Sequence, residues 1–276
     1  MSVLNFIRAN SDWDEQVKKI GSRYDPTIKI PNLVYDAHEI DRELAIFFRV
    51  SGEIQPWQSR PDVPNRNMSG GCLTYNPAYP KEEWLTCGFG NKRYQHLDNT
   101  TYFTAVNKDT PFIQKDDYLD IHTFRKMHPH LEQVCPHLTK TLNGFKVPLV
   151  NVNVRVIHGQ NVSPTSFSTK TGGMHKDQSP FTAVRANMYI STDGNYGLEY
   201  ENGDLIMPGA GENFVVNTDV PHRAYIKDWN MTNRVNIVLN MLPWLDYDSE
   251  DDSWSFNEYY GKIHPYDMIR EGLFYG

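Results

Sequence analysis

Two histidines and one aspartate are spaced in a way that suits a metal centre. His175 and Asp177 are separated by a single residue, and His222 lies further along the chain. Two imidazoles and one carboxylate fill three positions of an octahedron and leave the others open, the arrangement that non-haem Fe(II) uses for chemistry with O2. These residues therefore indicate an iron site with room for further ligands.

Two extended segments are needed to bring these ligands together. Residues two apart in a strand share a face, so a strand over 172–177 would deliver His175 and Asp177 to the same side. His222 opens a second strand-like segment, residues 222–227, which would supply the third ligand. A His-x-Asp pair also occurs by chance in many proteins, so support must come from the elements around it.

Three runs near these residues alternate between apolar and polar positions. They cover 149–157, 184–190 and 234–241, and alternation of this length predicts half-buried strands. The polar positions carry Asn, Arg and Tyr with almost no Lys or Glu, which favours directed hydrogen bonding in a cavity. A sheet with one ordinary solvated face is the alternative. The polar positions are Asn151, Asn153, Arg155, Arg185, Asn187, Tyr189, Arg234, Asn236 and Asn240.

With these segments the chain resembles the Fe(II)/2-oxoglutarate-dependent oxygenase superfamily, whose core is a double-stranded β-helix, or jelly roll, of eight antiparallel strands. The resemblance covers residues 147–243, and Gly, Pro, Asn and Asp residues typical of turns separate the runs. It implies a mainly β fold with flanking helices. The strand-like segments are 149–157, 172–177, 181–191, 196–200, 204–207, 213–217, 222–227 and 233–242.

The resemblance implies a role for each matching residue. His175, Asp177 and His222 become the iron ligands, and the Asp177 carboxylate favours hydroxylation because related halogenases lack it. Arg234 stands where the family has the basic residue that holds the distal carboxylate of 2-oxoglutarate, and a guanidinium can do so through two parallel hydrogen bonds. Asn236 follows at a position where family members often have Ser.

Other polar residues compete for contacts to the cosubstrate. Arg155, Arg185 and Arg223 are alternatives to Arg234 for the carboxylate, and each has a second interpretation as a surface salt-bridge partner. The residues expected to make secondary contacts to the cosubstrate or around the metal are Asn151, Asn153 and Tyr189.

These assignments predict an Fe(II)- and 2-oxoglutarate-dependent dioxygenase, a hydroxylase that uses O2 and releases succinate and CO2. The expected substrate is a small molecule, an amino acid or a protein side chain. Two alternatives stay open: a cupin-like metalloenzyme that does not use 2-oxoglutarate, and a non-catalytic jelly-roll binding module. The Ser/Thr/Gly-rich connection at 158–173 predicts either a substrate-gating loop or a disordered segment.

Composition limits the remaining possibilities. The 276 residues fit a single domain, with a helical and loop-rich support at 1–146, the core at 147–243 and a tail at 244–276. A net charge of −7 argues against binding of double-stranded nucleic acid. No apolar run reaches the roughly 20 residues that span a bilayer, and the first residues are too polar for a secretory signal, so we expect a cytoplasmic protein without membrane contact. The aromatic tail predicts packing against the core or a homodimer interface.

Helical spacing in the first half of the chain predicts segments that brace the core. They lie at 12–22, 39–50 and 116–142, and two prolines interrupt the last. The last segment contains four histidines. We expect no second metal site there, since no acidic residue or Cys stands at ligand spacing to them. The cysteines are scattered and odd in number, which favours reduced thiols over a disulfide framework. They are Cys72, Cys87 and Cys135.

Overall fold

The computed structural model describes most of the predicted core and part of the N-terminal support. The helix predicted at 12–22, the predicted ligand Asp177 and most of the connection 158–173 lie outside the described residues. The described residues are 27–60, 63–89, 120–161, 174–176, 180, 183–218 and 220–276, without the side chains of 57–60, 63–66, 120 and 121.

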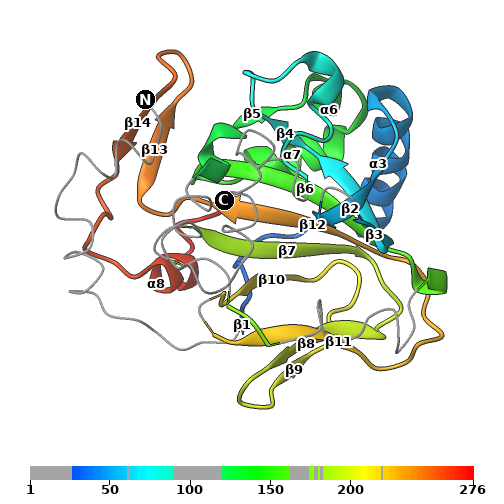
Figure 1. Ribbon diagram of the computed structural model, residues 1–276. Coiled ribbons are helices and arrows are strands. Elements are labelled where there is room, and N and C mark those ends of the chain that lie inside the picture. Colours follow the sequence, from blue (N-terminus) through cyan, green and yellow to red (C-terminus); the bar gives the residue numbers. More distant parts are fainter. Residues whose placement is uncertain are drawn as a thin grey trace.

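Two antiparallel sheets form the core (Figure 1). The large sheet has the strand order β1-β10-β7-β12-β6-β3-β2, and the small sheet, below it in Figure 1, has the order β11-β8-β9. The strands of the large sheet are β1 (Thr27–Ile28), β2 (Gln55–Arg60), β3 (Val63–Cys72), β6 (Leu149–Ile157), β7 (Val184–Ser191), β10 (Asn213–Val216) and β12 (Arg234–Met241). Those of the small sheet are β8 (Tyr196–Tyr200), β9 (Leu205–Ile206) and β11 (His222–Ile226).

The chain crosses between the two sheets as a double-stranded β-helix requires. It leaves the large sheet after β7, forms β8 and β9 in the small sheet, returns for β10, crosses again for β11 and ends the core with β12. The predicted mainly β jelly-roll fold is confirmed. The strand predicted at 172–177 is represented among the described residues by a single antiparallel bridge between His175 and His222.

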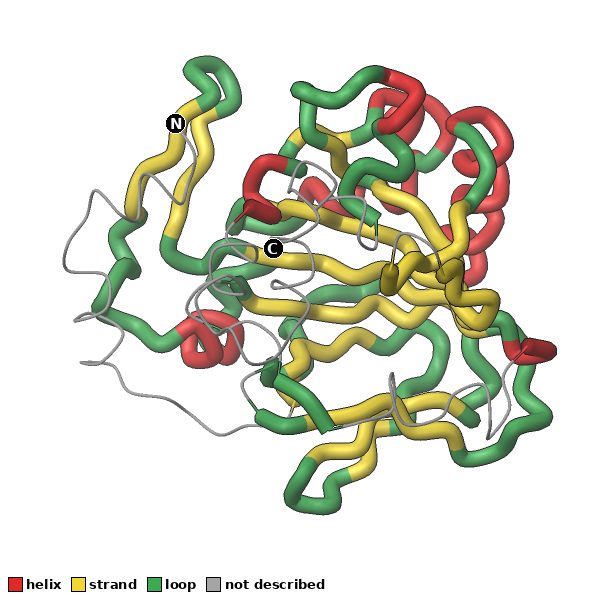
Figure 2. The backbone as a smooth tube through the Cα atoms, in the orientation of Figure 1, coloured by secondary structure: helices red, strands yellow, loops and turns green. Residues whose placement is uncertain are grey.

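The large sheet has one polar and one apolar face, as the alternation of β7 and β12 predicts. Partners in an antiparallel pair share a face. Asn236 pairs with Tyr189 and Asn240 with Arg185, whereas Ile237 pairs with Met188 in the apolar core. The apolar face packs against three helices, seen in Figure 2; they include the helix predicted at 39–50, and two of them lie in the second half of the predicted segment 116–142. These helices are α3 (Ala37–Ser51), α6 (Pro129–Val134) and α7 (Pro136–Asn143).

The regular alternation predicted for β6 is interrupted at Asn151. Its φ of 45° lies in the left-handed region, and the register to β12 shifts between Val238 and Asn240. Both observations mark a β-bulge, which adds one residue to a strand and breaks its alternation. The N–H of Asn151 donates to the carbonyl oxygen of Phe124 at 2.8 Å, and Val150 pairs with Asn240. The bulge therefore interrupts the predicted alternation, although Val150, Val152 and Val154 all remain in the apolar core.

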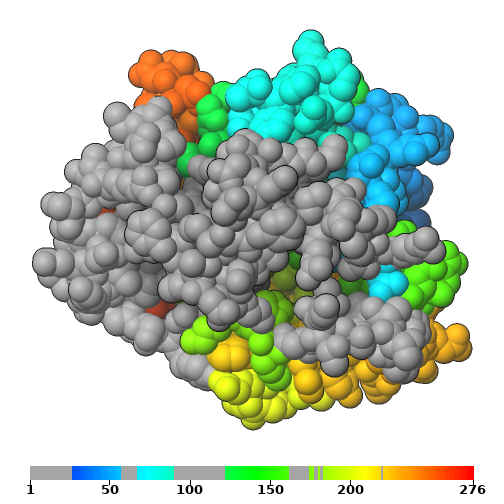
Figure 3. All heavy atoms as spheres, in the orientation of Figure 1, coloured from blue at the N-terminus to red at the C-terminus, as the bar shows by residue number. Residues whose placement is uncertain are grey.

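The remaining elements lie around the core. The hairpin of β13 and β14 projects at the edge of the molecule, at the upper left of Figure 3. All three cysteines are buried, and none of them is in a disulfide. No helix among the described residues is long and apolar enough to cross a membrane. The elements are β4 (Thr74–Tyr75), η1 (Lys81–Glu83), η3 (Asp120–Thr123), β5 (Lys126–Met127), η4 (Gly159–Asn161), β13 (Leu245–Asp248), β14 (Ser253–Phe256) and α8 (Pro265–Arg270).

A buried carboxylate fastens α7 to α3. Glu43 on α3 is 4% exposed and accepts hydrogen bonds from the backbone N–H groups of His137 (2.9 Å) and Leu138 (3.0 Å), in the first turn of α7. It also lies 2.8 Å from Nδ1 of His137. Glu39, Glu43 and His137 form a group whose potential metal-ligand atoms lie within 4.8 Å of one another. Helix α3 thus places acidic side chains beside His137, although no acidic residue stands at ligand spacing in the sequence around it. The bonds from α7 already engage both Glu43 oxygens, which indicates a helix cap.

Replacing Glu43 with Ala should lower the free energy of unfolding by about 2 kcal/mol, because it leaves buried N–H groups of α7 without acceptors. Urea denaturation of the two proteins measures the difference. The matched control is Glu39→Ala, which removes a more exposed carboxylate from the same helix and should change the free energy by less than about 0.5 kcal/mol. Equal effects of the two substitutions would contradict the capping role.

Candidate metal and cosubstrate site

Two of the three predicted metal ligands lie side by side. The backbone N–H of His175 donates to the carbonyl oxygen of His222, and the N–H of His222 donates to that of His175, both at 3.0 Å. The centroids of the two imidazole rings are 4.8 Å apart. The structure thus brings together one histidine that precedes the large-sheet strand β7 and one that opens β11, whereas Asp177 lies outside the described residues.

A backbone carbonyl fixes the protonation of His222. Its Nδ1 lies 2.9 Å from the carbonyl oxygen of Val220. A carbonyl can only accept, so Nδ1 carries a proton, and in the neutral imidazole Nε2 then carries the lone pair. A second hydrogen bond of this kind orients metal-ligating histidines and raises their basicity. His222 is 5% exposed and therefore presents a preoriented, nearly buried nitrogen donor.

Arg234 is a buried cation at the first position of β12. It is 6% exposed, and one of its Nη atoms donates to the side-chain oxygen of Asn236. Its guanidinium carbon lies 3.9 Å from the ring centroid of Tyr196 and 5.4 Å from that of Tyr189. In the described part of the chain no carboxylate forms an ion pair with it, and its Nε has no hydrogen-bond partner. A buried charge without a counter-ion is costly, so this position fits a ligand carboxylate.

Two buried phenols connect Arg234 with His222. Tyr200 pairs with His222 across the small sheet, and the ring centroids of these two residues are 5.8 Å apart. Burial raises the pKa of Tyr189 to about 12, although the nearby charge of Arg234 lowers it. Burial also raises the pKa of Tyr200, and neighbouring Tyr189 raises it further. Both hydroxyls therefore stay protonated and can donate hydrogen bonds.

Side-chain amides extend from Arg234 across the polar face. The side-chain nitrogen of Asn236 donates to the side-chain oxygen of Asn187 on β7 at 2.6 Å. The sequence placed Asn187 on this face but suggested no role for it. Its strand position was visible in the alternation, but its link to Arg234 depends on the register of β7 and β12.

The bulged strand β6 carries a second polar chain. The Nε of Arg155 donates to the side-chain oxygen of Asn153 at 3.2 Å, and the side-chain nitrogen of Asn153 donates to the carbonyl oxygen of Asn151 at 2.9 Å. The register places Arg155 opposite Asn236. A Cβ at Gly88 would lie 2.9 Å from the side-chain oxygen of Asn151, so this side chain is packed against the loop before the core.

The other two arginines do not share the position of Arg234. Arg223 forms an ion pair with Glu199 at 2.6 Å, and its side chain is 43% exposed, as expected of a surface pair. Arg185 pairs with Asn240, six residues along β12 from Arg234, which corresponds to about 20 Å at the rise of a strand. Arg155 is therefore the nearest of the three alternatives.

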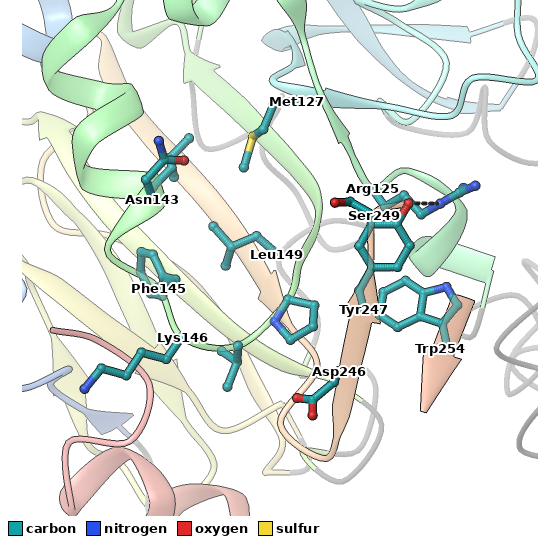
Figure 4. A pocket seen from close by; sticks show the side chains of 13 residues that line it. Arg125, Met127, Asn143, Phe145, Lys146, Leu149, Asp246, Tyr247, Ser249 and Trp254 are labelled. Carbon is teal, nitrogen blue, oxygen red and sulfur yellow. Dashed lines mark hydrogen bonds between the residues drawn. The ribbon is translucent and has the colours of Figure 1, made fainter. Parts of the chain in front are cut away.

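A separate pocket of about 630 Å³ lies between the β13–β14 hairpin and the segment that follows α7 (Figure 4). The rings of Tyr247 and Trp254 form the hairpin side, and Arg125 is bound there to Tyr247 and Asp252. Leu149 lines the other side of the pocket. It pairs with Met241 at one end of β12, whereas Arg234 lies at the other end of that strand. The pocket is thus distinct from the site around Arg234.

Comparisons with known proteins give no assignment by sequence. No family model matches the chain, and no curated protein matches it. Among solved structures, the chain is similar to a full-length Neurospora crassa protein in complex with alpha-KG and 5-formyluracil, with 14% identity, a TM-score of 0.38 and coverage of 89% of this chain and 85% of that one. It is also similar to the alpha-ketoglutarate-dependent epimerase SnoN from nogalamycin biosynthesis, with 11% identity, a TM-score of 0.36 and coverage of 85% and 82%.

A third similar structure is a prolyl hydroxylase from Trichoplax adhaerens in complex with a hypoxia inducible factor peptide fragment. It has 10% identity, a TM-score of 0.35 and coverage of 87% of this chain and 91% of that one. These identities and TM-scores are too low to support an inference about activity or substrate. The function of this chain has to be inferred from its own residues and their geometry.

Proposed function

We propose that this protein is an Fe(II)- and 2-oxoglutarate-dependent dioxygenase that hydroxylates a small molecule, an amino acid or a protein side chain. The observation that carries the proposal is the buried guanidinium of Arg234, which has no counter-ion among the described residues and lies in the same jelly-roll core as the paired residues His175 and His222. The guanidinium of Arg234 favours an anion, and the pair His175 and His222 favours a metal ion. A cosubstrate that carries a carboxylate at one end and chelates iron at the other meets both requirements.

The metal would be held by His175, Asp177 and His222. The hydrogen bond from Nδ1 of His222 to Val220 orients the imidazole before metal binds. The Asp177 carboxylate would reduce the charge of the bound ion. When bound, Fe(II) together with 2-oxoglutarate and O2 supplies the oxidising power for hydroxylation of a C–H bond, with release of succinate and CO2.

Arg234 and its neighbours would orient the cosubstrate. Asn236 holds one edge of the guanidinium, and the ring of Tyr196 covers one of its faces. Its Nε lacks a hydrogen-bond partner in the described part of the chain and would bind a carboxylate oxygen. The apolar cluster of Ile157, Tyr196 and Met231 lies at this end of the core and would exclude water from the ion pair, which strengthens it.

The proposal is tested by anaerobic titration of the Fe(II)-loaded protein with 2-oxoglutarate. A weak visible metal-to-ligand charge-transfer band should appear and saturate, since it requires both the metal and the chelating 2-oxo acid. A folded, iron-bound protein without this band would instead indicate a metalloenzyme that does not use 2-oxoglutarate. A folded protein that binds no iron would indicate a binding module.

Substitution of His222 or Asp177 by Ala should abolish tight Fe(II) binding and keep the fold, because each removes one of three ligands and leaves the apolar face of the large sheet unchanged. The bound iron per chain and the melting temperature are the measurements. Arg223→Ala is the control, since this exposed residue is the neighbour of His222 on β11. Iron binding by the His222 variant at the level of this control would refute the ligand assignment.

Substitution of Arg234 by Ala should weaken 2-oxoglutarate binding about 10- to 100-fold and leave Fe(II) binding unchanged. The lost interaction is a charge-assisted pair of about 1.5–3 kcal/mol. Titration of the charge-transfer band in each variant gives the dissociation constants. Arg155→Ala is the comparison, because it removes the alternative cation nearest to Arg234. A larger loss of affinity in the Arg155 variant would transfer the carboxylate role to that residue.

A further inference from the structure

Helices α3 and α7 bring three potential metal ligands together beside the apolar face of the large sheet. Glu39 and Glu43 are four residues apart on α3, so their side chains lie on the same face of that helix. His137 lies in the first turn of α7 and turns its imidazole toward both carboxylates. The ligands therefore come from two helices that are far apart in the sequence.

The distances within this group suit a transition-metal ion. Nδ1 of His137 lies 2.8 Å from Oε1 of Glu43 and 3.9 Å from Oε1 of Glu39. Zn²⁺ lies about 2.0–2.2 Å from imidazole nitrogens and carboxylate oxygens, which separates the ligand atoms of a tetrahedral site by about 3.3–3.6 Å. The observed distances lie on either side of this spacing. The side chains of His137 and Glu39 are 57% and 26% exposed, so small rotations can adjust them.

The helix cap formed by Glu43 leaves room for such an ion. Oε1 accepts from the backbone N–H of His137 and Oε2 from that of Leu138. Each carboxylate oxygen has two lone pairs, and a carboxylate can only accept, so Nδ1 of His137 donates its proton to the second lone pair of Oε1. A metal ion that replaces this proton keeps both hydrogen bonds of the cap.

The charges around His137 also favour a cation. Arg42 pairs with Oε2 of Glu39, which leaves Oε1 on the side of His137. The carboxylate of Glu43 is almost completely buried, and a buried charge is stabilised by an opposite charge close to it. A protonated imidazole supplies one positive charge between the two carboxylates, whereas a divalent ion supplies two and binds all three groups.

We propose that Glu39, Glu43 and His137 bind a divalent transition-metal ion such as Zn²⁺, with water completing its coordination. A ligand set that contains imidazole suits Zn²⁺ better than Ca²⁺ or Mg²⁺, which prefer oxygen ligands alone. The ion would link α3 to α7 and so stabilise the helices that cover the large sheet. This site lies on the opposite face of that sheet from Arg234 and does not depend on the proposed function.

The inference is tested with Zn²⁺, which has no redox chemistry. Calorimetric titration of the His222→Ala protein, in which the predicted iron site lacks a ligand, should show about one tightly bound Zn²⁺ per chain. Bound Zn²⁺ should raise the melting temperature, since it binds the folded chain. Adding His137→Ala should weaken binding at least about 100-fold, because loss of a residue that merely orients a ligand already costs roughly 10- to 100-fold. The shift in melting temperature should disappear as well.

A second variant and a control separate metal binding from folding. Glu39→Gln keeps the size of an exposed side chain and removes its charge, so it should weaken Zn²⁺ binding at least about tenfold. His38→Ala removes an exposed imidazole from the same helix and should leave the affinity unchanged. His137→Ala keeps the backbone N–H groups that Glu43 binds. Melting temperatures without metal should therefore stay close to that of the parent protein.

Two results would overturn the inference. One is equal Zn²⁺ affinity in the His137→Ala and His38→Ala proteins. The other is binding that requires His137 but not Glu39, since a single surface imidazole would then be the ligand. Failure of the proposed function has a different signature, the absence of the charge-transfer band in the wild-type protein, and it leaves the effect of His137→Ala on Zn²⁺ binding unchanged.

Discussion

The guanidinium of Arg234 imposes a constraint on the polar half of the core, because it carries a full charge in a nearly water-free place and can only donate hydrogen bonds. Asn236 has to turn its oxygen toward it, and Asn187 has to turn its oxygen toward Asn236. The ring of Tyr196 covers a face of the cation at 3.9 Å, which compensates part of its lost hydration. Among the described residues no carboxylate pairs with this cation, which is the observation that supports the proposed anion site.

The large sheet makes this arrangement possible by separating two kinds of packing. Its apolar face forms one continuous cluster with α3, α6 and α7, and Glu43 fastens two of these helices together. The polar face can then hold amides and guanidinium groups without weakening the fold, because the stabilising burial lies on the other side. Stability and recognition therefore depend on different faces of the same strands.

The sequence predicted the strands and the faces well where local pattern decides them. The alternation in β7 and β12 needed only the period of a strand, and it placed Arg234, Asn236 and Asn187 on one face. It did not predict the bulge at Asn151, because the bulge involves the backbone of Phe124, a contact that no local pattern encodes. The link between Asn187 and Arg234 was also invisible, since it depends on a hydrogen bond from Asn236 on another strand.

Burial of the cysteines has a practical consequence. The chain contains three, and each is buried and outside any disulfide. Burial raises the pKa of the Cys87 thiol to about 11 and that of Cys135 to about 12, so little reactive thiolate forms near neutral pH. A single cysteine introduced on the exposed turn of the β13–β14 hairpin would accept a fluorescent or spin label selectively, without prior removal of the native thiols.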